Sequence, residues 1–247
     1  MVSFTNIIRK LSSEVPFVGP ETKERQLSKK FIARLGANES VFGPSDKVIK
    51  AMKNCVENDI WKYGDPENFD LKFALSKKLN VGFENILIGE GIDALLGYLV
   101  RLLVNKKTKV ITSLGAYPTF NYHVRASGGQ LIFVPYRTDH ENLEGLLEAT
   151  IKNKAKLIYL ANPDNPMGTV HDGEKIKDFV NNLPDYSLLC LDEAYSDFVS
   201  NKYIPSIEID NEKVIRFRTF SKAYGLAGAR IGYAFGEKNI IKNFDKI

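Results

Sequence analysis

Residues 187 to 195 read SLLCLDEAY, an apolar run that ends in the two acidic residues Asp192 and Glu193. The run does not alternate between apolar and polar side chains, which is typical of a strand covered on both faces. A carboxylate that emerges from a buried strand is costly unless a cationic partner meets it, although an isolated acid in this position can equally cap a helix. The stretch therefore predicts a central strand of a covered sheet.

Six more apolar runs lie around this one, and the segments between them have the apolar spacing of amphipathic helices, as in residues 91–104 and 171–183. The alternation predicts an α/β three-layer sandwich with a seven-stranded, mostly parallel sheet. Helices are also predicted over residues 45–56 and 68–81, and at the end of the chain from residue 237. The six runs are ILIG (86–89), KVITS (109–113), QLIFVP (130–135), AKLIYLAN (155–162), KVIRFRTF (213–220) and ARIGYAFG (229–236).

Composition and charge exclude several classes of protein. The chain has 247 residues, 44% of them hydrophobic, and a net charge of +4 from basic and acidic side chains that are interleaved along the sequence. No basic block argues for nucleic acid or for an anionic membrane surface. We expect no export signal, because the N-terminus has no long apolar region or small-residue cleavage site, and no membrane span, because no window approaches eighteen consecutive apolar residues. The two distant cysteines, Cys55 and Cys190, favour a reducing, cytoplasmic setting. No metal site is predicted.

Polar residues follow several of the apolar runs, where ligands of open α/β sheets bind. The run ILIG leads into a glycine-bearing turn that opens a helix, and such a turn is either a plain connection or an anion site. The run AKLIYLAN continues into PDNPMGT, whose two Asn-Pro steps make a rigid turn and place Asn162 and Asn165 at the crevice edge. Each feature alone has a structural explanation.

The stretch RTFSKAYGLAGAR (218–230) gives these features a common chemistry. Lys222 follows a buried strand, so partial desolvation lowers its pKa and makes the amine a nucleophile for a carbonyl. Thr219, Ser221 and Arg230 offer two hydroxyls and a cationic fork, the groups that a phosphate dianion prefers. Together with the aspartate and tyrosine of DEAY, they describe a site for pyridoxal 5′-phosphate.

At this point the sequence resembles a known family, the fold-type I pyridoxal-phosphate aminotransferases of class I/II, and within it the histidinol-phosphate aminotransferase branch. The resemblance covers the chain from about residue 35 to its end. The matching stretches, in the family's order and spacing, are LGANESVFGPS, KYGDPEN, ILIGEGID, AYPTFNYH, ANPDNPMGT, DEAYSDF and RTFSKAYGLAGARIGY.

The resemblance implies a role for each site residue. Lys222 is expected to form the imine with the cofactor and to move the proton at the substrate α-carbon, and Asp192 to pair with the pyridine nitrogen. Tyr195 and Asn165 are expected to bond the 3′-oxygen, and Tyr117 to stack on the ring. A homodimer is implied, in which Tyr63 reaches the neighbour's phosphate. The phosphate site is expected to comprise Thr219, Ser221, Arg230 and the backbone of Gly91, Ile92 and Asp93.

The sequence departs from the family's pattern in three motifs and in length. Ile92 stands where a small residue is usual, Met167 replaces a threonine, and the motif NENP is here NESV, residues 38 to 41. Residues 1–36 are interpreted as an arm or partial accessory segment, and 37–247 as the cofactor-binding large domain without the family's C-terminal small domain. That domain carries the arginine expected to grip the substrate α-carboxylate. Candidate substitutes in this chain are Arg9, Arg25 and Arg34.

The predicted function is transfer of an amino group between an amino acid or a histidinol phosphate-like amine and a 2-oxo acid, with the activity of this chain alone impaired. An aromatic amino acid is an alternative substrate. Two other functions stay open at this stage. One is a non-catalytic protein that keeps the fold, and the other is a pyridoxal-phosphate decarboxylase of an amino-acid phosphate. A chain of this length is interpreted as a fragment, a truncated product or half of a split enzyme.

Overall fold

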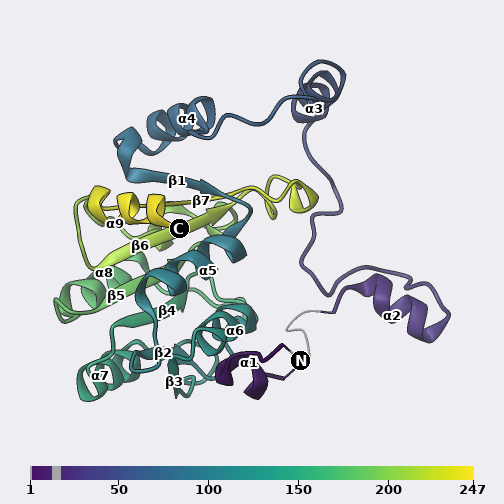
Figure 1. The fold of residues 1–247 in the computed structure, drawn as a ribbon. Coiled ribbons are helices and arrows are strands. Elements are labelled where there is room, and N and C mark those ends of the chain that lie inside the picture. The colour runs from purple at the N-terminus through teal and green to yellow at the C-terminus, as the bar shows by residue number, and fades with distance from the viewer. Residues whose placement is uncertain (1, 13–17) are drawn as a thin grey trace.

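A computed structural model describes residues 2–12 and 18–247, and within them the predicted seven-stranded sheet is confirmed (Figure 1). The strand order is β1-β7-β6-β5-β4-β2-β3. Strand β7 runs antiparallel to both of its neighbours, and every other pairing is parallel. The strands are β1 (Ile86–Gly89), β2 (Lys109–Ser113), β3 (Gln130–Val134), β4 (Leu157–Ala161), β5 (Leu188–Asp192), β6 (Val214–Thr219) and β7 (Gly232–Gly236).

Both faces of the sheet are covered by helices, as the uninterrupted apolar runs predicted. Strand β4 shows why: all five of its residues are buried, Tyr159 in one core cluster and Ile158 and Leu160 in the other. Alternate side chains of a strand point to opposite faces, so a strand between two helix layers must be apolar throughout. One layer comprises α5 (Ile92–Leu103), α6 (Pro118–Ala126) and α9 (Lys238–Lys242), and the other α7 (Leu143–Asn153) and α8 (Gly173–Asn182).

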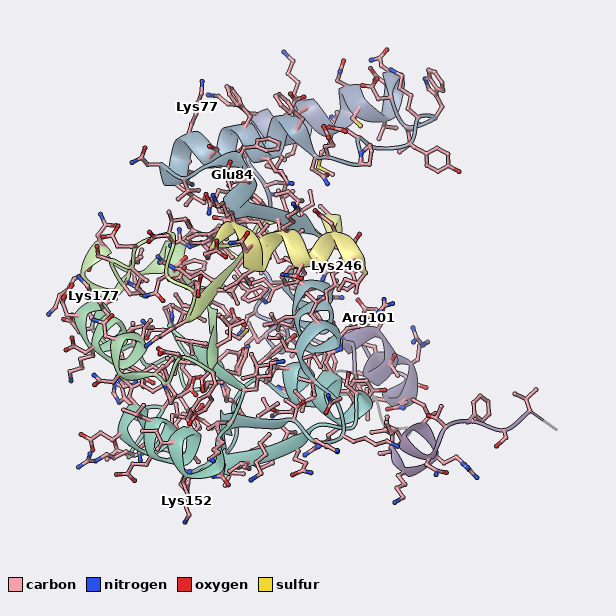
Figure 2. The ribbon with its side chains drawn as sticks, turned by 60° about the vertical axis from the view of Figure 1, so that its left-hand side comes forward. Lys77, Glu84, Arg101, Lys152, Lys177 and Lys246 are labelled. Atoms are coloured by element: carbon pink, nitrogen blue, oxygen red, sulfur yellow. The ribbon has the colours of Figure 1, made fainter. Side chains whose placement is uncertain are left out.

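The charged faces of these helices point outward. Figure 2 shows Lys77, Arg101, Lys152 and Lys177 directed away from the body of the protein. They belong to α4 (Phe69–Leu79), α5, α7 and α8 respectively, and α4 packs near β1 at the edge of the sheet. The predicted terminal helix is present as the short helix α9: Glu237 caps it by accepting from the amides of Asn239 and Ile240, and residues 243–246 form a 3-10 turn.

The N-terminal part of the chain packs differently from the sandwich. Three helices, α1 (Asn6–Lys10), α2 (Pro20–Leu27) and α3 (Asp46–Asn58), have no buried residue. Figure 1 shows α2 and α3 standing away from the sheet. Residues 1 and 13–17 of the predicted 1–36 arm lie outside the described residues. In the described part of the chain, no helix has the length and apolarity needed to cross a membrane.

Candidate active site

A cavity of ≈ 660 Å³ opens where β4, β5 and β6 end. Ala161, Asp192 and Thr219 are the last residues of these three strands, and all three line the cavity. The carboxyl ends of adjacent parallel strands meet at one edge of a sheet, which is where open α/β sheets bind ligands. A volume of this size suits a cofactor-sized molecule. The cavity also includes residues 36–39, which cross from the N-terminal segment.

The structure brings together nearly all of the predicted site residues. Gly91 does not line the cavity but lies against the guanidinium of Arg230. Tyr63 is fully exposed and lies outside the cavity of its own chain, so its role stays a prediction. The predicted residues that line the cavity are Ile92, Asp93, Tyr117, Asn165, Asp192, Tyr195, Thr219, Ser221, Lys222 and Arg230.

One end of the cavity has the features of an anion site. Helix α5 begins at Ile92, and its N-cap Gly91 has φ +85° and supplies no side-chain cap, so the positive end of the helix dipole faces the site. A Cβ at Gly232 of β7 would lie 2.8 Å from both the Gly91 carbonyl carbon and the Ile92 nitrogen, so only glycine allows this close approach. Thr219 Oγ1 accepts from the Ser221 amide at 3.0 Å, which folds the loop after β6 toward the same end.

Ile92, which departs from the family's small residue, causes no conflict at this end. Its side chain is buried in the core cluster beneath α5. A bulky residue is accommodated there because the side chain packs into the core while the backbone stays at the helix start.

Lys222 lies in the cavity with its amine in a partly desolvated position. Burial lowers the pKa of Lys222 below its ordinary value, although the charges of Asp192 and Glu39 act in the opposite direction. The Nζ atom donates to the carbonyl oxygens of Ala37 and Asn38 at 2.9 and 3.4 Å. It also lies 5.6 Å from the centroid of the Tyr195 ring. A larger neutral fraction of this amine makes it a better nucleophile than a surface lysine.

Asp192 is the buried carboxylate that the opening stretch of sequence singled out. Burial raises its pKa, and two donors act against that rise: the Tyr159 hydroxyl on Oδ2 at 2.8 Å and the Ala194 amide on Oδ1 at 3.0 Å. Among the described residues, no cation forms an ion pair with Asp192 within 4.0 Å. One donor, Tyr159, comes from β4, and the other, the Ala194 amide, follows the end of β5. Asp192 also lines the cavity.

The two tyrosines of the site differ in their partners. Burial raises the pKa of both Tyr117 and Tyr195. The Tyr195 hydroxyl accepts from Asn38 Nδ2 at 2.9 Å, which leaves its own proton available for a ligand oxygen. Sequence reasoning did not select Asn38 as a site residue. Its location in the family stretch LGANESVFGPS was the available sequence signal, and the structure adds that its φ is positive, at 51°.

Two arginines of β6, the strand next to β5, form ion pairs with Glu193, the residue that follows Asp192. Arg216 donates to Glu193 Oε1 at 2.6 Å and Arg218 to Oε2 at 2.8 Å, and the carboxylate is 1% exposed. Burial raises the pKa of Glu193, but the two guanidinium charges outweigh it and hold the pKa below its usual value. This cluster fixes the residue that follows Asp192, and sequence reasoning gave it no role.

The candidate substitutes for a carboxylate-gripping arginine do not reach the cavity. Arg34 forms ion pairs with Glu21 and Glu39, Arg25 donates to Thr22, and Arg9 donates to Asn6. Among the described residues, Arg230 is the only arginine that lines the cavity.

Comparison with known proteins gives this site a family. Residues 31–247 match the family described as "Aminotransferase class I and II". The chain belongs to this family. Among similar members, the histidinol-phosphate aminotransferase of Moorella thermoacetica is 32% identical over 237 residues, which are 94% of this chain and 61% of that protein. That of Desulfotalea psychrophila is 35% identical over 221 residues, 87% of this chain and 58% of that protein.

Solved aminotransferase structures agree with this membership. The histidinol-phosphate aminotransferase of Sinorhizobium meliloti, solved in complex with pyridoxal-5′-phosphate, has a TM-score of 0.96 and 53% sequence identity. The match covers 100% of this chain and 66% of that one. An aspartate aminotransferase of Thermus thermophilus shares the fold, with a TM-score of 0.84 at 22% identity. This aminotransferase chain thus spans about three fifths of the length of the relatives from M. thermoacetica and D. psychrophila.

Proposed function

We propose that the chain binds pyridoxal 5′-phosphate in this cavity and transfers an amino group between a histidinol phosphate-like amine and a 2-oxo acid. One observation carries the proposal: the Lys222 amine, the buried Asp192 carboxylate and the positive start of α5 line a single cavity at the carboxyl edge of the sheet. The names of the similar proteins support the substrate class, and the S. meliloti structure supports the cofactor.

The residues present fit that cofactor. When bound, pyridoxal phosphate supplies a carbonyl for an amine and a ring that accepts an electron pair from the substrate α-carbon. The close backbone approach permitted by Gly232 would leave room for the phosphate at the start of α5, and Thr219, Ser221 and Arg230, which line the same cavity, would bind it. Asp192 would hold a proton on the pyridine nitrogen, and Tyr195 and Asn165 would hold the 3′-oxygen.

Lys222 would serve twice in the reaction. Its neutral Nζ would be the nucleophile that holds the cofactor, and the same Nζ would move a proton to and from the substrate α-carbon. Both steps need the unprotonated amine, which the lowered pKa of Lys222 favours. Tyr117 would cover one face of the ring and exclude water there.

Mixing the purified chain with pyridoxal phosphate tests the proposal directly. We expect visible absorption from the lysine-bound cofactor, and a borohydride-stable mass increase that maps to Lys222. Turnover with histidinol phosphate and a 2-oxo acid is expected to be about a hundredfold or more below that of a full-length relative, because no described arginine besides Arg230 lines the cavity to orient a carboxylate. Adding the C-terminal portion of a relative should raise that turnover.

The same assay separates the alternatives. A protein that is colourless after the unbound cofactor has been removed contradicts the proposal and leaves a non-catalytic fold. Carbon dioxide release from an amino-acid phosphate, without formation of a new amino acid from the 2-oxo acid, identifies a decarboxylase instead.

We also propose that the chain forms a homodimer in the cytoplasm through the surface around α3. Trp61 and Ile60, which follow α3, are 79% and 71% exposed, and exposed apolar side chains grouped in this way mark an interaction surface. The two free thiols, Cys55 and Cys190, are in keeping with a reducing compartment. Sedimentation should give twice the 27.8 kDa chain mass, and Trp61→Glu should reduce it to one chain. A monomeric wild-type chain would exclude the dimer.

A further inference from the structure

Tyr159 is a fully buried tyrosine whose hydroxyl donates to a carboxylate oxygen of the site. The distance from its hydroxyl oxygen to Asp192 Oδ2 is 2.8 Å, and the tyrosine itself is 0% exposed. In the parallel pairing of β4 with β5, Tyr159 lies opposite Cys190 and Ala161 opposite Asp192. Side chains two residues apart share a face, so Tyr159 lies one repeat deeper in the sheet than Asp192, on the same side.

The ring of Tyr159 is itself held in place. It stacks on Phe120 of α6, with ring centroids 4.6 Å apart and an interplanar angle of 20°. Burial raises the pKa of Tyr159 well above its ordinary value, so its hydroxyl stays protonated and acts as a donor throughout the range in which enzymes work. The group therefore neither gives up nor takes a proton. It can only position and polarise its acceptor.

The contact matters because the surroundings of Asp192 favour its neutral form. Burial and the neighbouring Glu193 raise the pKa of Asp192, while Lys222, the Ala194 amide and Tyr159 lower it. The Ala194 amide is backbone and is bonded to the other carboxylate oxygen. Tyr159 is thus the side-chain hydrogen-bond donor to Asp192 that opposes the effect of burial on this carboxylate. The charge of Asp192 also raises the pKa of four neighbouring groups, which are Tyr117, Glu141, Cys190 and Tyr195.

We propose that Tyr159 is a positioning residue, which holds Asp192 in one orientation and in its ionised form. The proton that Asp192 shares with the cofactor then lies on the pyridine nitrogen. This inference rests on the proposed function. One proton is shared between the Asp192 carboxylate and the ring nitrogen. A donor on Asp192 makes the carboxylate less basic, so the proton stays on nitrogen. Loss of that donor makes the carboxylate more basic and moves the proton onto Asp192.

The test is the protonation of the ring nitrogen in protein loaded with ¹⁵N-labelled pyridoxal phosphate. In the wild type, the ¹⁵N chemical shift should be that of the protonated ring. In Tyr159→Phe, it should move toward that of the neutral ring, with about a tenfold change in the ratio of the two proton positions. A role in packing alone would lower the melting temperature without moving the ¹⁵N shift, so both are measured.

Tyr233→Phe is the matched control. Tyr233 is also a buried tyrosine of the sheet, and it interacts electrostatically with Arg218 rather than with Asp192. Its removal should leave the ¹⁵N shift unchanged. A Tyr159→Phe protein with the wild-type ¹⁵N shift overturns the inference while the proposed function stands. A wild-type chain that binds no pyridoxal phosphate overturns both.

A second measurement does not depend on the folding of the Tyr159 variant. In protein labelled at the tyrosine Cζ position, the Tyr159 resonance reports the hydrogen bond of its hydroxyl. It should shift when Asp192→Asn replaces the charged acceptor with a neutral one. An unchanged resonance overturns the inference.

Discussion

Lys222→Ala protein is expected to show no visible absorption once unbound pyridoxal phosphate has been removed, and no borohydride-stable cofactor adduct. The amine at this position is the only lysine nitrogen of the described residues that lines the cavity. Without it, the nucleophile and the proton carrier are lost together. Loss of the proton transfer alone should slow amine transfer about 100- to 10,000-fold. Absorbance titration, mass spectrometry and a single-turnover assay measure the three effects.

The control for this substitution is Lys213→Ala. Lys213 directly precedes β6, at the opposite end of the strand from the cavity, where its amine donates to the Leu183 carbonyl at 2.7 Å. It is partly buried like Lys222, so its removal should perturb packing to a similar degree and leave cofactor attachment unchanged. If Lys222→Ala kept the visible band, or if the reduced adduct mapped to another lysine, the assignment of this amine would be wrong.

The pH dependence of attachment gives a separate reading of the same amine. The rate of cofactor attachment should rise with pH, because only the neutral Lys222 amine reacts. Because burial lowers the pKa of Lys222, this rate should level off below the pH at which an ordinary lysine side chain loses its proton. A rate that still rises through that pH would indicate an unperturbed amine.

The sheet could be predicted from the sequence because its strands are short, apolar throughout and separated by amphipathic segments. In β4 and β5 this pattern follows from burial on both faces, so the strand bounds agree with the apolar runs to within a few residues. Helices α6 and α7 were not singled out. Helix α6 begins at Pro118 inside the family stretch AYPTFNYH, and its buried face includes the polar residues Thr119 and Asn121, so apolar spacing does not mark it.

The predicted site residues come together because most of them lie at or just after strand ends, and a parallel sheet places such ends side by side. The residues that were missed act through partners far away in the sequence. Tyr159 lies inside the apolar run AKLIYLAN and has the pattern of a core residue, and only the pairing of β4 with β5 brings it to Asp192. Asn38 lies 157 positions from Tyr195, and no local pattern reports such a contact.

Glu193→Ala is expected to lower the free energy of unfolding by about 3–5 kcal/mol, because it leaves Arg216 and Arg218 as uncompensated buried charges. Their guanidinium groups lie 4.9 and 5.2 Å from the centroid of the Phe235 ring, and neither side chain is more than 14% exposed. Since folded domains are stable by only about 5–15 kcal/mol, a large part of the total would be lost. Urea unfolding followed by circular dichroism measures the change.

The control is an exposed ion pair of the same two residue types. Arg137 bonds Glu144 at 2.9 Å, with side chains 71% and 80% exposed, so Glu144→Ala should cost about 1 kcal/mol or less. The two variants should also differ in pH dependence. The folded pKa of Glu193 is depressed, so its contribution is present above the unfolded pKa and is lost as pH falls through the folded one. The stability difference between wild type and Glu193→Ala should therefore shrink in acid. Equal losses in the two variants at neutral pH would show that the buried cluster adds no more stability than a surface pair, and would leave Asp192 dependent on Tyr159 and the Ala194 amide for its position.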